Sequence, residues 1–276
     1  MRVSDWLVAH FIVMLLACSA EDGTKARPPQ RSANTAPTLP GAVSPPTAAT
    51  QKDQNSSAAS DVAAYPVRWW SGLELKTLAE ASKLYTATQA GAFGDLQRGD
   101  VTKRPNDCVE WTKLHADGYE PTTTVEAQAD SGAKLRCMTL LLLQRAQPAK
   151  ASYVRDLAWD RSLLSVLPAA VATAFNKERE QAVTEATSKG LTLAQFDGKA
   201  KVKPSQEEQT LEITEGGGQT MILVHAEAWG DLNDDGVDDI ALSVVNGATQ
   251  GTYSYVRLLT LFRNTSGAML TQVMVK

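Results

Sequence analysis

The sequence predicts an α+β fold in which a helical N-terminal half is followed by an antiparallel β-meander. Helix-capping pairs and apolar residues at helical spacing dominate residues 63–200. β-branched residues, apolar–polar alternation and glycine-rich turns dominate residues 201–276. The connections between the predicted strands are short, which favours antiparallel pairing of neighbours.

Capping pairs and stop residues predict three helices in the first part of the helical region. The first follows Ser71 and Glu74 and stops at Gly91, the second follows Asp107 and Glu110 and stops before Gly118, and the third opens at Ser131 and ends before Pro148. A further helix or pair of helices is expected over residues 160–189, divided at Pro168 and ended by Gly190. Strands are expected near residues 209–214, 219–229, 239–246, 253–263 and 269–275.

The chain begins with a segment typical of export, MRVSDWLVAHFIVMLLACSAED. Arg2 precedes an apolar stretch from Trp6 to Ala17, which at ~12 residues has the length of a signal-peptide core and is too short to span a membrane. The tetrapeptide Leu15-Leu16-Ala17-Cys18 resembles the lipobox of bacterial lipoproteins. An ordinary secretory signal with an incidental cysteine is the alternative.

The lipobox resemblance implies a location and an anchor. Residues 1–17 would be removed as the signal peptide, and Cys18 would carry fatty acyl chains such as palmitate that bind the lipid bilayer. Ser19 follows the cysteine in place of Asp, which in this class implies an outer-membrane lipoprotein of a Gram-negative envelope, here expected to face the periplasm.

Residues 18–62 predict a disordered tether. Pro, Ala, Ser, Thr and Gln dominate the segment, and it has no aromatic residue. It cannot bury enough apolar surface to offset the entropy of ordering. A flexible chain of this length has a reach on the order of 40 Å, so the folded part would sample the periplasm away from the membrane.

Charge and cysteine content agree with an exported protein. Removing residues 1–17 takes away Arg2 and Asp5, so the net charge of −4 is unchanged and gives no support for a nucleic-acid partner. Cys18 is assigned to lipid, which leaves Cys108 and Cys137 as an expected disulfide in an oxidising compartment. A redox or metal-binding pair is the alternative, although the spacing fits no CxxC motif.

The stretch GDLNDDGVDDIAL, residues 230–242, has the composition of a calcium loop. Oxygen-bearing side chains recur at every second residue, Asp231, Asn233 and Asp235. Gly236 then permits a sharp turn, Val237 offers its backbone carbonyl, and Asp239 closes the set. Calcium takes six to eight such oxygen ligands, and its charge would relieve the repulsion among the aspartates.

This stretch resembles the calcium loops of the FG-GAP repeats of integrin-type propellers, whose pattern is Asp-x-Asp/Asn-x-Asp-Gly-x-x-Asp. The resemblance implies one structural Ca²⁺ held by Asp231, Asn233, Asp235, Val237 and Asp239. An EF-hand does not fit, because its twelfth position falls on Leu242 where a bidentate Glu is needed. A propeller does not fit either, because the motif occurs once. A solvated acidic hairpin without metal is the alternative.

No catalytic motif stands out, so an enzyme is the less favoured class. The sequence lacks GxSxG, HExxH and GxxxxGK[ST]. His225 and Glu227 share a predicted strand face near the loop and could act as acid and base, although a structural role is more common. We therefore expect an envelope-anchored lipoprotein with a calcium-stabilised binding or scaffold domain, whose partner is an envelope protein or peptidoglycan. The alternatives are a periplasmic hydrolase and an inhibitor or accessory factor of an envelope enzyme.

Overall fold

The computed structural model of the chain describes residues 65–69, 73–75, 78–89, 91–204, 209–250 and 254–272. The predicted signal peptide, the predicted acylation site Cys18 and the predicted tether lie outside these residues. Within the described ranges, no helix combines the length and apolar composition needed to cross a membrane.

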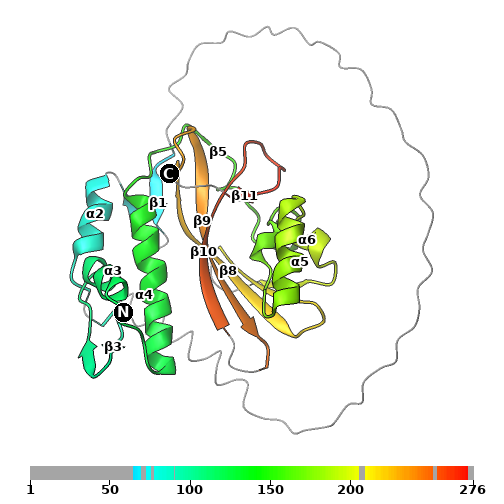
Figure 1. The fold of residues 1–276 in the computed structure, drawn as a ribbon. Helices are drawn as coiled ribbons and strands as arrows, with labels where there is room; N and C mark the ends of the chain where they lie inside the picture. Colours follow the sequence, from blue (N-terminus) through cyan, green and yellow to red (C-terminus); the bar gives the residue numbers. More distant parts are fainter. Residues whose placement is uncertain are drawn as a thin grey trace, which may run out of the picture. The chain divides into compact units, whose positions relative to one another are not determined.

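One large sheet organises the described chain (Figure 1). Its nine described strands are β1 (Val67–Trp69), β2 (Leu73–Leu75), β5 (Ala151–Ser152), β6 (Lys201–Pro204), β7 (Thr210–Glu215), β8 (Thr220–Gly230), β9 (Val237–Ala248), β10 (Ser254–Phe262) and β11 (Thr271–Gln272). Strands β6 to β11 follow one another as antiparallel neighbours. The end of β8 beyond β7 pairs with β1, which in turn pairs with β2. Strand β5 adds to the start of β9 in parallel.

Five α-helices and a separate hairpin complete the described fold. The helices are α2 (Leu78–Thr86), α3 (Cys108–Ala116), α4 (Thr124–Leu143), α5 (Lys177–Ser188) and α6 (Leu193–Phe196), with 3-10 turns η1 (Arg161–Ser165) and η2 (Ala169–Val171). The hairpin consists of β3 (Leu96–Arg98) and β4 (Val101–Lys103).

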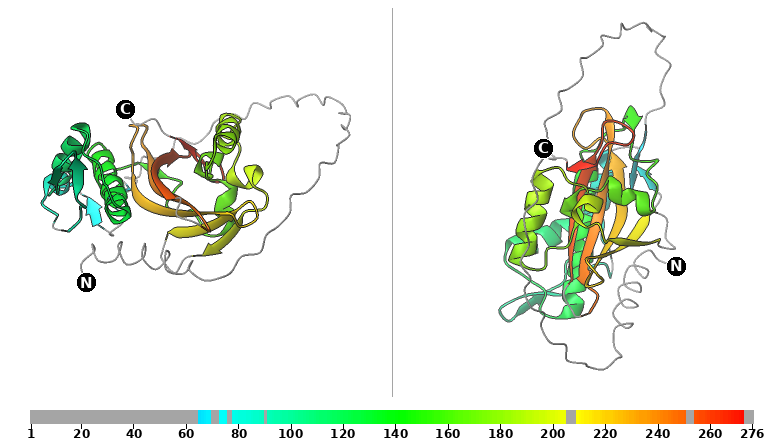
Figure 2. Two further views of the ribbon diagram at one scale, coloured as in Figure 1. Left: turned by 60° about the horizontal axis from the view of Figure 1, so that its bottom comes forward. Right: turned by 90° about the vertical axis from the view of Figure 1, so that its right-hand side faces the viewer.

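Helices cover both faces of the sheet (Figure 2). Successive residues of a strand point to opposite faces, so each strand packs its side chains against helices on both sides. Ile240 and Leu242 of β9 belong to the larger apolar cluster, which includes residues of α5 and α6. Ala241, between them, faces the other way and packs in a smaller cluster with Leu143 of α4. The sheet is curved, and α5 and α6 lie on its concave side.

The predicted division into a helical half and a sheet half is wrong. Strands β1 to β5 interleave with α2, α3 and α4, and β1 and β5 belong to the main sheet. The capping pair Ser71 and Glu74 predicts the start of a helix here, but Leu73–Leu75 forms strand β2 instead. Leu73–Leu75 pairs with the neighbouring strand β1, which in turn pairs with the distant β8, and local helix signals do not reveal this pairing.

The helix boundaries differ from expectation where a cap was misassigned. The cap at Asp107 is confirmed, since its Oδ1 accepts a hydrogen bond from the amide of Glu110 at 2.8 Å. Helix α4 begins seven residues before the expected Ser131, at a capping box in which Thr123 and Glu126 each accept a hydrogen bond from the other's amide. Residues 160–189 are only partly helical, because α5 does not begin until Lys177.

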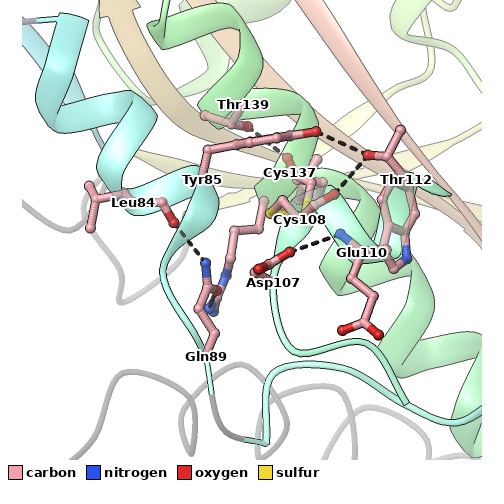
Figure 3. The surroundings of a disulfide bond; sticks show 12 residues. Leu84, Tyr85, Gln89, Asp107, Cys108, Glu110, Thr112, Cys137 and Thr139 are labelled. Atoms are coloured by element: carbon pink, nitrogen blue, oxygen red, sulfur yellow. Dashed lines mark hydrogen bonds between the residues drawn. A yellow bond between two sulfur atoms is a disulfide. The ribbon is translucent and has the colours of Figure 1, made fainter. Parts of the chain in front are cut away.

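A disulfide joins α3 to α4 (Figure 3). Cys108 and Cys137 are both fully buried, and their Cα atoms are 5.3 Å apart. A hydrogen-bond chain lies beside the bridge: the hydroxyls of Tyr85 and Thr112 are 3.0 Å apart, and Thr112 Oγ1 donates to the Cys108 carbonyl at 2.8 Å. The structure therefore links α2, α3 and α4 by covalent and polar contacts around one point.

Candidate calcium loop

The candidate metal ligands lie in the turn between β8 and β9, the two longest strands. The turn occupies residues 231–236. Gly236 has φ of +84°, a left-handed conformation that glycine adopts without strain, and Asp234 has φ of +65°, which aspartate tolerates better than most residues. The sequence motif thus corresponds to a tight turn between antiparallel strands.

The polar side chains of the turn fold back over its own backbone. Asp231 Oδ2 accepts from the Gly236 amide at 2.8 Å, and Asp235 Oδ1 accepts from the Val237 amide at 2.7 Å. The amide of Asp235 lies 3.2 Å from Asp231 Oδ1 and 3.0 Å from Asn233 Oδ1. One backbone donor is therefore shared by two of the expected ligand side chains, which places their oxygens close together.

Asp239 is the most enclosed carboxylate of the candidate site. The residue is fully buried, and its Oδ2 accepts from the Leu232 amide at 2.8 Å. Its Oδ1 is buried without a hydrogen-bond partner. The pKa of Asp239 is raised to about 7, chiefly by burial and in part by the neighbouring carboxylates of Asp235, Asp231 and Asp238, while the hydrogen bond from Leu232 opposes the rise. A buried, unsatisfied carboxylate oxygen is costly unless a cation or donor completes it.

The oxygen donors of the turn fit calcium in type. Asp231, Asn233, Asp235 and Asp239 supply hard side-chain oxygens, and an oxygen that accepts one hydrogen bond keeps a lone pair for a ligand. In the part of the chain that the structure describes, no three or more His, Cys, Asp or Glu side chains are arranged to hold a metal ion. Binding would therefore require side-chain rotation within the turn, and the ligand set remains a prediction.

Asp238 has a different partner from its neighbours. Its carboxylate accepts from Arg155 Nε at 2.5 Å and from the Ser152 hydroxyl at 2.9 Å, and the residue is fully buried. Burial raises the pKa of Asp238, while the hydrogen bonds and charge of Arg155 oppose that rise. Successive residues of a strand point to opposite faces, so Asp238 turns away from Asp239 and serves as an anchor for Arg155.

His225 and Glu227, the candidate acid–base pair, are each held by other side chains. His225 Nδ1 lies 2.6 Å from Thr210 Oγ1, and burial lowers the pKa of His225 to about 4. Glu227 occupies an irregularity in the pairing of β8 with β9 and is 9 % exposed. Burial raises the pKa of Glu227 to about 7, opposed by a hydrogen bond from Ser243 and the charge of Arg136. These contacts are typical of a buried structural cluster.

Comparison of the chain with protein-family models, with curated proteins and with solved structures gave no match.

Proposed function

We propose that this chain is an envelope-anchored lipoprotein whose folded domain is a non-enzymatic binding or scaffold module stabilised by one calcium ion. Cys18 holds it to the outer membrane, facing the periplasm, and the tether of residues 18–62 separates the domain from the bilayer. The partner is an envelope protein or peptidoglycan.

The observation that carries the calcium assignment is the buried Oδ1 of Asp239, which has no hydrogen-bond partner beside a turn rich in oxygen donors. Calcium would coordinate that oxygen together with Asp231, Asn233, Asp235 and the Val237 carbonyl. The charge of the ion would also offset the mutual repulsion of the carboxylates. The role is structural, because the turn joins the two longest strands and the ion would fix their relative position.

A binding module is favoured over a hydrolase by the surroundings of the candidate acid–base pair. His225 is bonded to Thr210 and Glu227 to Ser243, and α4 covers this side of the sheet through Arg136. These side chains therefore already have partners within the core.

Thermal melts of the mature lipoprotein in detergent micelles, in calcium, magnesium and chelator, test the proposal. Calcium a hundredfold above its dissociation constant should add about 2.7 kcal/mol of stability, because only the folded form binds. Loops of this extracellular type bind at roughly 10⁻⁴–10⁻³ M, so a chelator should act easily. Magnesium should substitute poorly, because it prefers octahedral geometry at shorter distances.

Two variants that each remove one negative charge from the turn separate coordination from simple charge relief. Asp235→Ala deletes a ligand and should abolish the calcium-dependent rise in melting temperature. Asp234→Asn removes the charge of a residue outside the ligand set, at a positive φ that asparagine tolerates, and should retain the rise. Superimposable melting curves in calcium and chelator, with no heat of calcium binding by calorimetry, would reduce the turn to an acidic hairpin.

A further inference from the structure

One short segment forms backbone hydrogen bonds with both ends of the candidate calcium turn. We call residues 147–152 the strap. At the start of the turn, Gln147 and Asp231 exchange two backbone hydrogen bonds, both 2.9 Å. At its end, the amides of Lys150 and Ala151 donate to the Gly236 carbonyl at 2.8 and 3.2 Å. The strap then continues as β5 beside Val237. A change in the shape of the turn would therefore alter the hydrogen bonds that position the strap.

The other side of the strap holds the first described residues of the chain. We call residues 65–69 the junction, because in the sequence they follow the expected tether. Tyr65 and Ala149 exchange two backbone hydrogen bonds, of 2.6 and 3.0 Å. The strap is thus bonded through its backbone to both the turn and the junction.

Arg155 ties the junction to the strand that leaves the turn. Its Nη2 donates to the Pro66 carbonyl, and its Nε donates to the buried carboxylate of Asp238 at 2.5 Å. The guanidinium carbon also lies 5.4 Å from the centre of the Tyr65 ring. The side chain of Arg155 is 14 % exposed, so this link is shielded from water and from screening by salt.

Apolar packing provides a third link. Leu232, inside the turn, is 5 % exposed and shares an apolar cluster with Val67 of the junction. The amide of Leu232 donates to Asp239 Oδ2, so the position of this side chain depends on an expected calcium ligand. Gly230 makes room for the approach, since a Cβ there would lie 3.1 Å from Ala146 Cβ and 3.4 Å from Val67 Cγ2.

We infer that the calcium turn is a clamp for the point where the tether enters the fold, so that calcium occupancy controls how firmly the junction stays docked on the sheet. This inference rests on the proposed calcium binding. With calcium bound, Asp231 and Asp239 are fixed, and the strap, Arg155 and Leu232 hold residues 65–69. Without calcium, repulsion among the carboxylates loosens the turn, and the junction opens more readily than the rest of the sheet.

Hydrogen exchange followed by mass spectrometry tests the clamp in the mature lipoprotein, titrated with calcium chloride in detergent micelles. If the junction opens only after calcium leaves, its exchange rate falls by the factor by which calcium stabilises the closed form. At a hundredfold excess over the dissociation constant, that factor is about 100. Peptides covering residues 65–69 and 229–240 should therefore slow together. Helix α5 is the internal control, because it packs on the face of the sheet opposite to Val67 and Leu232. Its exchange rate should change little when calcium is added.

Arg155→Met is the variant that uncouples the two sites. It should keep the calorimetric heat of calcium binding and the calcium-dependent slowing of exchange in the turn, residues 231–236, while the calcium-dependent slowing at the junction falls well below about 100-fold. Arg161→Met, at an exposed position, is the matched control and should behave like the wild type.

The possible failures are distinct. Calcium binding by calorimetry without slowing at residues 65–69 would overturn the clamp and leave the proposed function standing. Equal slowing of α5 and the junction would also overturn it, because calcium would then act only through global unfolding. The absence of any heat of binding would rule out the calcium binding of the proposed function and the clamp together.

Discussion

Arg155 and Asp238 form a buried ion pair across 83 residues of chain, with Nε 2.5 Å from Oδ2. Asp238 is fully buried, and the guanidinium also reaches the Pro66 carbonyl. The pair joins the segment that follows β5 to strand β9 and to the junction at Pro66. Removing the arginine leaves a buried carboxylate without its counter-charge, which is more costly than the loss of the attraction alone.

Arg155→Met should therefore lower the free energy of unfolding by about 3 kcal/mol, within the range for breaking a buried pair. Urea denaturation in a constant calcium concentration measures the change. Arg161→Met, at an exposed position, should change stability by less than about 0.5 kcal/mol. Equal shifts in the two variants would show that the ion pair adds no stability beyond that of a surface arginine.

The Cys108–Cys137 bridge should be oxidised in the protein isolated from cells. The two residues are separated by 29 positions, and closing a loop of this size stabilises by about 3.6 kcal/mol in the chain-entropy model. The double variant Cys108→Ala with Cys137→Ala should lose about that much in urea denaturation. Alkylation of the denatured, non-reduced wild type should modify neither cysteine, and full labelling of both would rule the bridge out.

The strands with long alternating patterns were predictable from sequence, and the short ones were not. Strand β8 was expected at residues 219–229 and lies at Thr220–Gly230, because eleven residues carry enough period-2 signal to mark a half-buried strand. Strands β1 and β2 have three residues each and β5 has two, too few for any periodicity. These short strands form because β1 pairs with β2 and β8, and β5 pairs with β9. The predicted division into a helical half and a sheet half is therefore wrong.

The turn itself could be predicted from its local spacing, because its oxygen donors lie within nine residues of one another. Its surroundings could not. The strap pairs with Tyr65 and with Asp231. Tyr65 precedes its partner in the strap by more than 80 residues, and Asp231 follows its partner in the strap by more than 80 residues. Leu232 follows Asp231 in a polar run, and only the fold shows that it is buried beside Val67. The start of α4 was a missed local signal, since Thr123 and Glu126 have capping-box spacing.

Cys18 should be the acylated N-terminus of the mature protein. Its position at the end of the apolar segment is the feature that supports lipidation. Cys18→Ser should abolish metabolic labelling with fatty acid and give a soluble or unprocessed form, while Ser19→Ala leaves both labelling and membrane fractionation intact. A Cys18→Ser protein that still labels and sediments with membranes would contradict the lipobox assignment.

His225 and Glu227 should oppose each other in the dependence of stability on pH. Burial raises the folded pKa of Glu227 from 4.5 to about 7, so between these values the native state holds a proton that the unfolded state releases. Its contribution to stability therefore falls as pH rises through that window. Burial lowers the folded pKa of His225 from 6.5 to about 4, so its contribution is lost as pH falls through that range. The two effects offset each other where the windows overlap.

Glu227→Gln and His225→Gln should expose these opposing contributions in urea denaturation between pH 4 and 8. A shift of this size corresponds to on the order of 3 kcal/mol for each group. Relative to the wild type, Glu227→Gln should gain stability as pH rises toward 7, because the glutamine removes the cost of ionising a buried carboxyl. His225→Gln should gain relative stability as pH falls from 6.5 toward 4, because no buried imidazole then resists protonation. Differences from the wild type at equal calcium cancel the titration of the turn carboxylates. Variant curves that run parallel to the wild type across the whole range would mean that neither side chain changes its proton affinity on folding.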